Sequence, residues 1–332
     1  MAFVLLFIGL TLGGSLWALA QAPVRGSELV ALVTSLPAPW IAVVVALCAG
    51  IYATDVLRYR ALGDAVGAPV GWRAGLEASV ANFFFSWITP GSTFGAPATI
   101  YMLGRRGVAW DAAVVIAFGK AFTGVAVIIV LSLALIALGL GPAHDLAVLA
   151  VVLFGGAVFG ALFAVGVVAA LRPAAAQRAV TALLAWVERR LGRGRVVTAF
   201  ERVTARSIDR LAHLRAGGWR PLLRLAATHI LYFAVFAGLG VALLAAFGVP
   251  PGIRPFAATI VYIAFTYLAP TPGGAGFAEA MAIPFFGALL PPDRAVLFVL
   301  CFRGLTLYLQ VGFAVPYLAI IGGGAIADQA DP

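Results

Sequence analysis

Charged and metal-binding residues are scarce in this sequence. Charged side chains make up only 11% of the 332 residues, against roughly 25% in ordinary soluble domains. The two cysteines, Cys48 and Cys301, both fall in apolar stretches, and the three histidines share no ligand spacing. These shortages argue against a disulfide framework, and we predict neither a bound metal nor another cofactor.

Apolar residues, in contrast, make up 63% of the chain. One soluble core could not bury that much apolar surface, so we predict an all-α polytopic membrane protein. About six spanning helices of roughly 20 apolar residues are expected. The first is predicted to stay uncleaved, although Ala18-Leu19-Ala20 resembles a cleavage site, because no basic residue precedes it. The predicted spans are residues 2–20, 38–57, 111–139, 146–171, 222–247 and 295–322.

Two further apolar regions are interrupted by proline and glycine. Residues 74–103 are broken at Thr89-Pro90-Gly91, and residues 255–290 at Pro270-Thr271-Pro272-Gly273-Gly274. Each half has roughly 10 to 15 residues, too few to cross the membrane as a helix. Non-helical backbone at that depth is tolerated only beside protein or water. We therefore predict two re-entrant helical hairpins.

The net charge of +9 suggests nucleic-acid binding until the charges are located. Seventeen arginines, twelve of them in the stretch Arg172–Arg224, fall in one set of loops, whereas the opposite loops hold only Arg25, Arg254 and Arg294. The positive-inside rule therefore places both termini and segment 172–220 in the cytoplasm. We predict a bacterial-type inner membrane protein without a nucleic-acid partner.

The charges that flank the hairpins predict how these are oriented. Arg73 and Arg105 flank the first hairpin on the basic side, whereas Arg254 and Asp293 flank the second on the opposite side. Each hairpin thus makes no net crossing, and the two are expected to enter from opposite faces.

An internal repeat agrees with this orientation. A shift of 182 positions places Thr89-Pro90-Gly91 on Thr271-Pro272-Gly273. We predict a single membrane domain, 1–332, with an inverted repeat of halves 38–139 and 222–322. This architecture is typical of transporters, whose sites lie near the midplane at the repeat interface.

The long polar segment 172–220 has the pattern of an interfacial amphipathic helix. We predict a solvated cytoplasmic helical hairpin that lies on anionic headgroups, with a role in partner binding as the alternative. The apolar positions at helical spacing among the arginines are Val180, Leu183, Leu184, Val187 and Leu191.

Three charged residues are expected inside the membrane. Lys120 lies about nine residues into its span and Arg303 about eight, which places both roughly 12 to 14 Å deep. Glu279 follows the second break. An uncompensated charge there costs at least about 2.5–3.5 kcal/mol. A Glu279–Arg303 ion pair that only fixes the hairpin, and a site for a substrate anion, are both compatible with the pattern.

The hairpin breaks supply further candidate residues. Their glycines either permit a tight backbone reversal or expose N–H groups to an anionic headgroup. Polar side chains nearby could hydrogen-bond a headgroup, although aromatic residues are also common at membrane interfaces. The candidates are Pro90, Gly91, Pro272, Gly273, Gly274, Gly276, Asn82, Tyr101 and Tyr308.

No catalytic constellation is present in the sequence. It offers no set of nucleophile, base and acid, and no carboxylate cluster near a loop. Asp55, Asp64 and Glu77 are expected near the cytoplasmic face at no diagnostic spacing. We therefore predict that the chain is not an enzyme.

The broken regions carry a family resemblance that spans nearly the whole chain. TPGSTFGAPATIYML at 89–103 and PTPGGAGFAE at 270–279, with a basic residue in the helix after each, resemble the flippase-like membrane domain of the lysylphosphatidylglycerol synthase/flippase family. Phe94 replaces a usual glycine, and Ala96 replaces a usual glutamine, so a different substrate is compatible. The matching residues are Thr89, Pro90, Gly95, Pro97, Ile100, Tyr101, Lys120, Pro272, Gly273, Gly274, Gly276, Glu279, Arg303 and Tyr308.

The resemblance implies a lipid translocator that moves a polar-headed lipid between leaflets. Bifunctional relatives carry an additional soluble aminoacyl-transferase domain, which this chain is expected to lack because it ends at Pro332. Anionic phospholipids and polyprenyl- or hopanoid-type lipids are compatible partners, and so are a homo-oligomer or a lipid-modifying enzyme. A secondary transporter of a small organic anion and a membrane scaffold subunit are the alternative functions.

Overall fold

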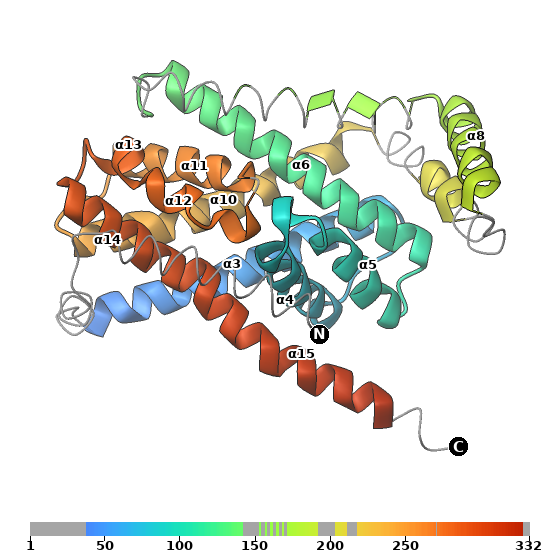
Figure 1. Ribbon diagram of the computed structural model, residues 1–332, viewed down its shortest axis with the longest axis horizontal. Helices are drawn as coiled ribbons and strands as arrows, with labels where there is room; N and C mark the ends of the chain where they lie inside the picture. The colour runs from blue at the N-terminus through green and yellow to red at the C-terminus, as the bar shows by residue number, and fades with distance from the viewer. Residues whose placement is uncertain are drawn as a thin grey trace.

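The computed structural model describes residues 38–141, 171–191, 203–210, 218–269 and 271–327, together with isolated positions between 153 and 168. Every regular element in these ranges is helical (Figure 1). The principal elements are α3 (Ala38–Ala65), α4 (Trp72–Ile88), η1 (Pro90–Ser92), α5 (Gly95–Arg105), α6 (Trp110–Ala137), α8 (Pro173–Leu191), α10 (Trp219–Ala246), α11 (Ile253–Tyr267), η2 (Pro272–Gly274), α12 (Phe277–Ala280), α13 (Ala282–Phe286), α14 (Pro292–Arg303), η3 (Gly304–Tyr308) and α15 (Leu309–Ala327).

Four helices among the described residues are long and apolar enough to cross a membrane. They coincide with four of the six predicted spans, and the other two, 2–20 and 146–171, lie outside the described residues apart from isolated positions. The four helices are Pro39–Ala65, Trp110–Ala137, Trp219–Ala246 and Pro292–Ile320.

The chain breaks at both predicted places, and the cause is local. Thr89 precedes a proline and has extended backbone angles, φ −120° and ψ 142°, because the proline ring disfavours the α-helical region for its predecessor. Thr271, before Pro272, is extended in the same way, with φ −86° and ψ 154°. After each break the chain turns back, so that α4 packs on α5, and α11 packs on α12 and α13.

The element order repeats along the chain. A long helix, a broken hairpin and another long helix occur first as α3 to α6 and again from α10 to α15. The short turns η1 and η2 begin 182 residues apart, at Pro90 and Pro272, and so do the helices α6 and α14, at Trp110 and Pro292.

The corresponding first helices of the two halves, α3 and α10, pack extensively against each other. They run antiparallel, because Gly50 faces Val235 while Leu47, nearer the start of α3, faces Gly238, which lies further along α10. Two main hydrophobic cores fill the described helices. One surrounds Tyr59 and lies mostly in the first half, whereas a larger one, rich in phenylalanine, surrounds Tyr262 and also includes Ile51, Phe83 and Ile128 of the first half.

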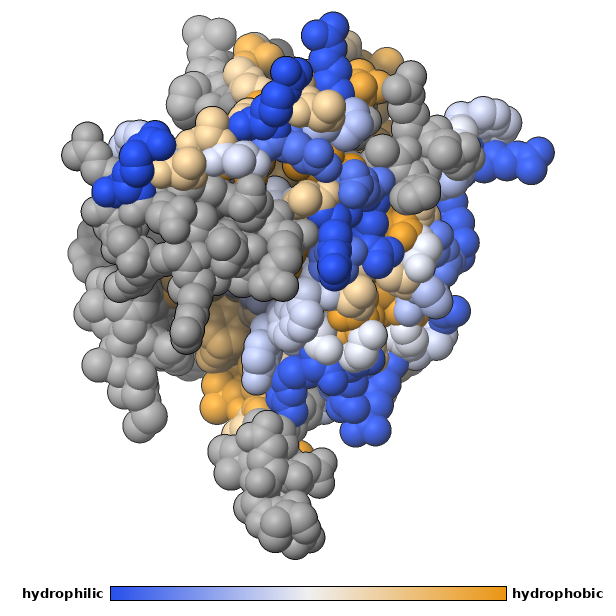
Figure 2. Space-filling model, turned by 90° about the vertical axis from the view of Figure 1, so that its right-hand side faces the viewer, coloured by the Kyte–Doolittle hydropathy of each residue, from blue (hydrophilic) through white to orange (hydrophobic). Residues whose placement is uncertain are grey.

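Hydrophilic residues gather at one end of the molecule, interspersed with apolar ones (Figure 2). Helix α8 and the helical residues 203–210 lie at this end, and Gln177 donates a hydrogen bond of 3.3 Å to Asp209 between them. Arg210 joins this segment to the membrane helices, because it pairs with Asp111 at the start of α6. Exposed arginines lie at the start of α4 and α10 and at the end of α5, namely Arg73, Arg220, Arg224, Arg105 and Arg106.

Candidate functional site

The tips of the two hairpins, η1 and η2, contact each other, and the first tip is exposed at Gly91 and Ser92. Both turns use the same backbone conformation, with φ of 56° at Gly91 and 57° at Gly273. This left-handed region is open to glycine at little cost and strained for other residues. The sequence breaks therefore produce two matching reversals that meet.

The backbone N–H groups of the second tip are used within the hairpin. Gly274 N–H donates to Thr271 O at 3.0 Å, and Gly276 N–H donates to Glu279 Oε2 at 2.9 Å. Of the two interpretations offered by the sequence, this arrangement favours glycines that permit a tight reversal.

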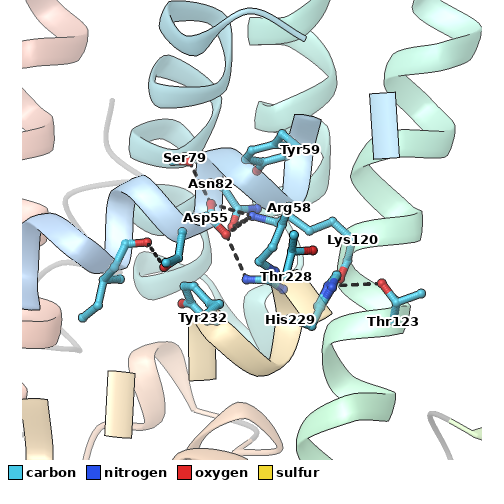
Figure 3. Close-up of polar contacts among 12 residues, drawn as sticks. Asp55, Arg58, Tyr59, Ser79, Asn82, Lys120, Thr123, Thr228, His229 and Tyr232 are labelled. Atoms are coloured by element: carbon cyan, nitrogen blue, oxygen red, sulfur yellow. Dashed lines mark hydrogen bonds and ion pairs between the residues drawn. The ribbon is translucent and has the colours of Figure 1, made fainter. Parts of the chain in front are cut away.

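A charged cluster, which we call the Asp55 cluster, lies buried between α3, α4 and α6 (Figure 3). Asp55 has no exposed surface. Its carboxylate accepts hydrogen bonds from Lys120 at 2.9 and 3.0 Å, from Arg58 Nη1 at 2.9 Å and from Ser79 at 2.8 Å. Lys120 also donates to Asn82 Oδ1 at 3.3 Å. Lys120 is thus a buried charge, as the sequence suggested. Its partner, Asp55, was not recognised from the sequence.

The Asp55 cluster contains more positive than negative charge. Two cations, Arg58 and Lys120, share the single carboxylate of Asp55. Aromatic faces stabilise both cations: Arg58 lies 4.2 Å from the centre of the Tyr232 ring, and Lys120 lies 4.1 Å from that of Tyr59. Arg58 Nε has no hydrogen-bond partner among the described residues.

Arg58 was one of the seventeen arginines assigned to loops, and that assignment is wrong, because Arg58 lies within helix α3. Helix α3 runs to Ala65, ten residues beyond Asp55, and Arg58 is only 3% exposed. The predicted span ended at residue 57 because a charged residue followed, yet a paired charge does not end a buried helix. The three-residue spacing of Asp55 and Arg58, which places them on one helix face, was the available signal.

His229 was also missed, because a single histidine has no recognisable spacing. It comes from α10 and is completely buried. Its Nε2 lies 3.3 Å from Lys120 O and 3.2 Å from Thr123 Oγ1, while Nδ1 lies 2.9 Å from Leu225 O. Thus α10 contacts the backbone of the helix that carries Lys120.

A cavity of about 160 Å³ adjoins the Asp55 cluster. Its wall combines the first hairpin tip, at Gly91 and Ser92, with α3, α6 and the end of α11. Arg58, Lys120 and Asn82 supply polar groups to this wall. An anion that entered the cavity would meet two buried cations and an amide.

The second charged pair, Glu279 and Arg303, closes the second hairpin. Arg303 Nε lies 2.7 Å from Glu279 Oε1, and Arg303 Nη1 donates to Gly273 O at 2.9 Å. Both side chains are almost fully buried. The ion pair foreseen from the sequence is therefore present, and it fastens the hairpin tip to α14.

Trp87 and Thr266 lie between the two charged sites, because both line the cavity and also a void of about 10 Å³ beside Arg303. Trp87 Nε1 donates to Gln310 Oε1 at 3.2 Å. Directly after Arg303 the helix forms one turn of π-helix, η3, a feature frequent at functional sites.

The remaining sequence candidates fall in different places. Tyr308 lies in η3, and its buried hydroxyl has no hydrogen-bond partner in the part of the chain described. Tyr101 is 56% exposed on α5 and does not line the cavity. Pro90 and Pro272 begin the two turns.

The sequence model of one protein family, the lysylphosphatidylglycerol synthase TM region, matches residues 5–314. The chain belongs to this family. The lysylphosphatidylglycerol synthase TM region is a membrane domain associated with lipid handling, so the chain is a multi-pass membrane protein of that kind. The match covers the hairpins, the Asp55 cluster and the Glu279–Arg303 pair. Among curated proteins, none matches the chain.

Proposed function

We propose that this protein moves a polar-headed, phosphate-containing lipid between the two leaflets of its membrane. The observation that carries the proposal is the cavity at the first hairpin tip, where Arg58 and Lys120 face one carboxylate, Asp55. Charged side chains inside a membrane bundle are costly and mark substrate pathways. The surplus positive charge suits the phosphate of a headgroup, and membership of a lipid-handling family supports the substrate class.

In this proposal both hairpins are re-entrant, and the two halves form an inverted repeat. The antiparallel packing of α3 against α10 supports the inversion, because these helices occupy corresponding places in the two halves. Binding near the midplane, between interrupted helices of opposite halves, is the arrangement that alternating access requires.

The Glu279–Arg303 pair acts in this mechanism as the clasp of the second hairpin. While Arg303 holds Gly273 O, the tip stays against α14. A headgroup phosphate that reaches Arg303 competes with Glu279 and frees the tip, so that the cavity opens to the other leaflet. Tyr308, next to this pair along the helix, supplies a hydroxyl for the headgroup.

We further propose that the membrane is a bacterial-type inner membrane and that both termini lie in the cytoplasm. The hydrophilic, arginine-rich end of the molecule supports this orientation through the positive-inside rule (Figure 2). The protein is proposed to act as a transporter and not as an enzyme.

A small organic anion is a second candidate substrate. The cavity of about 160 Å³ favours it, because pockets for drug-sized ligands usually measure about 300–1,000 Å³. Uptake of soluble anions into proteoliposomes distinguishes this secondary transporter from a lipid translocator.

The decisive experiment is leaflet exchange of fluorescent phosphatidylglycerol in proteoliposomes. We expect the wild type to exceed protein-free liposomes, and Arg58→Gln, Arg303→Ala and Glu279→Gln to lose most of the transfer. Arg224→Gln is the matched control, because it removes an equal charge from an exposed ion pair with Asp64.

Wild-type transfer equal to that of protein-free liposomes contradicts translocation of this lipid. A scaffold for a lipid-modifying enzyme then becomes the better hypothesis. It predicts a partner that co-purifies through segment 172–220.

A further inference from the structure

A second cavity, of about 580 Å³, opens on the outer surface of the first hairpin. We call it the outer groove. It lies between α4 and α5 on one side and α15 on the other, and it is lined mainly by apolar side chains. Phe94, Tyr101 and Val315 on its wall are each about half exposed, at 51%, 56% and 49%.

The polar groups of the outer groove are confined to one part of it. Of the described residues that line it, only Arg105 and Tyr101 carry polar groups in their side chains. Arg105 is the last residue of α5 and is exposed. The neighbouring Arg106 is held by Glu77, whereas Arg105 forms no ion pair with a described residue and lies 5.7 Å from the Tyr101 ring.

The length of the outer groove matches one leaflet. Phe94 is at the hairpin tip, and Arg105 is eleven positions further, at the end of α5. Eleven helical residues span about 16 Å, which is half of a ~30 Å hydrocarbon core. An acyl chain in the groove therefore reaches the hairpin tip when its headgroup lies at Arg105.

We infer that the outer groove binds one anionic phospholipid from the leaflet on the arginine-rich side, with an acyl chain along α5 and the headgroup phosphate at Arg105. Because surrounding lipid is itself apolar, the groove alone gives no preference among lipids, and Arg105 supplies the selectivity for negative charge. The role of the outer groove, which is to load lipid for translocation, rests on the proposed function. At the tip, Phe94 lines this groove while Ser92 lines the Asp55 cavity.

Native mass spectrometry of the full chain in detergent tests the inference directly. Phosphatidylglycerol and phosphatidylcholine with identical acyl chains are the probes. A basic side chain near an anionic headgroup contributes about 1 kcal/mol, which corresponds to about fivefold in affinity. We expect the wild type to prefer phosphatidylglycerol by about this factor and Arg105→Gln to remove the preference.

Matched variants separate the groove from general surface effects. Arg220→Gln removes an equal charge from an exposed position at the start of α10 and should keep the preference. Ala319→Trp fills the groove from α15 and should weaken both lipids severalfold, whereas Ile320→Trp, on a residue that is 74% exposed and outside the groove, should not.

An equal loss of the preference for phosphatidylglycerol in Arg105→Gln and Arg220→Gln overturns the inference. Unchanged lipid binding in Ala319→Trp also overturns it, because it would mean that another helix occupies the groove. If the wild type binds phosphatidylglycerol selectively but shows no leaflet exchange, the lipid site in the outer groove stands and the proposed function is contradicted. If the wild type exchanges lipid while the groove variants bind lipid normally, the proposed function stands and the lipid site in the outer groove is contradicted.

Discussion

The two halves of the molecule share an order of helices but differ in where they bury charge. The Asp55 cluster has two cations for one carboxylate and adjoins a cavity, whereas Glu279 and Arg303 form a closed pair that fastens a hairpin. Positions 182 residues beyond the polar members of the cluster are all apolar. Asp55, Arg58, Ser79, Asn82 and Lys120 correspond to Ala237, Gly240, Val261, Ala264 and Phe302.

The converse also holds, because Glu279 and Arg303 correspond to Pro97 and Ala121 in the first half. The two halves thus share an order of helices but carry buried charges at different positions and in different balance. Surplus charge beside a cavity suits ligand binding, whereas a neutral ion pair that also holds the hairpin backbone suits mechanical closure. The following experiments test this division of roles.

The largest effect is expected at Asp55. Asp55→Asn leaves Lys120 and Arg58 buried without an anion, and removing one member of a buried ion pair typically costs about 3–5 kcal/mol. Unfolding in detergent, followed by tryptophan fluorescence, measures the loss. Asp64→Asn is the control, because its exposed pair should contribute only about 0–1 kcal/mol. Wild-type stability in Asp55→Asn contradicts the structural role of the cluster.

A second comparison sets Arg303→Gln against Arg58→Gln. The first leaves Glu279 buried without its cation and should cost about 3 kcal/mol. The second leaves Asp55 bonded to Lys120, so only about 1–2 kcal/mol should be lost. Leaflet exchange, normalised to folded protein, should fall most in Arg58→Gln. Equal stability losses in the two variants would contradict the proposal that Arg303 fastens the hairpin while Arg58 binds ligand.

Gly240, the counterpart of Arg58, tests how tightly the second half is closed. A Cβ there would lie 2.5 Å from Thr259 Cγ2, so Gly240→Ala should destabilise the protein by about 1–3 kcal/mol through overpacking. Gly238→Ala, with its Cβ 3.6 Å from Leu47 Cδ2, is the control and should be tolerated. Thermal unfolding of both variants is the measurement, and equal midpoints would refute close packing at Gly240.

The smallest effect concerns a feature that the halves share. Gly91→Ala meets no atom within 4 Å, so its cost is the left-handed backbone alone, about 1–2 kcal/mol. Gly304→Ala, where the space is also open but φ is −50°, should be neutral or slightly stabilising. The same unfolding assay decides, and a destabilised Gly304→Ala with a neutral Gly91→Ala would contradict the reversal as described.

Much of the architecture could be predicted from the sequence. The four described spans, both helix breaks and the offset of 182 residues follow from the lengths of apolar runs and from proline positions, which act on the chain locally. The buried Glu279–Arg303 pair was also foreseeable, because Glu279 follows the second break and Arg303 lies within the next predicted span. Two of the predicted spans and parts of segment 172–220 concern residues outside those described.

The partners of the buried charges were decided by the tertiary structure. Lys120 and Asp55 are 65 positions apart, and their pairing depends on which faces of α3 and α6 meet. Arg58 resembled a loop arginine until the helix was seen to continue past it to Ala65. A helix accepts a charge at depth only if packing brings it a partner, and no local pattern records that partner. Hydrophobic length and proline therefore determined the helices, whereas contacts between helices decided which charges form the site.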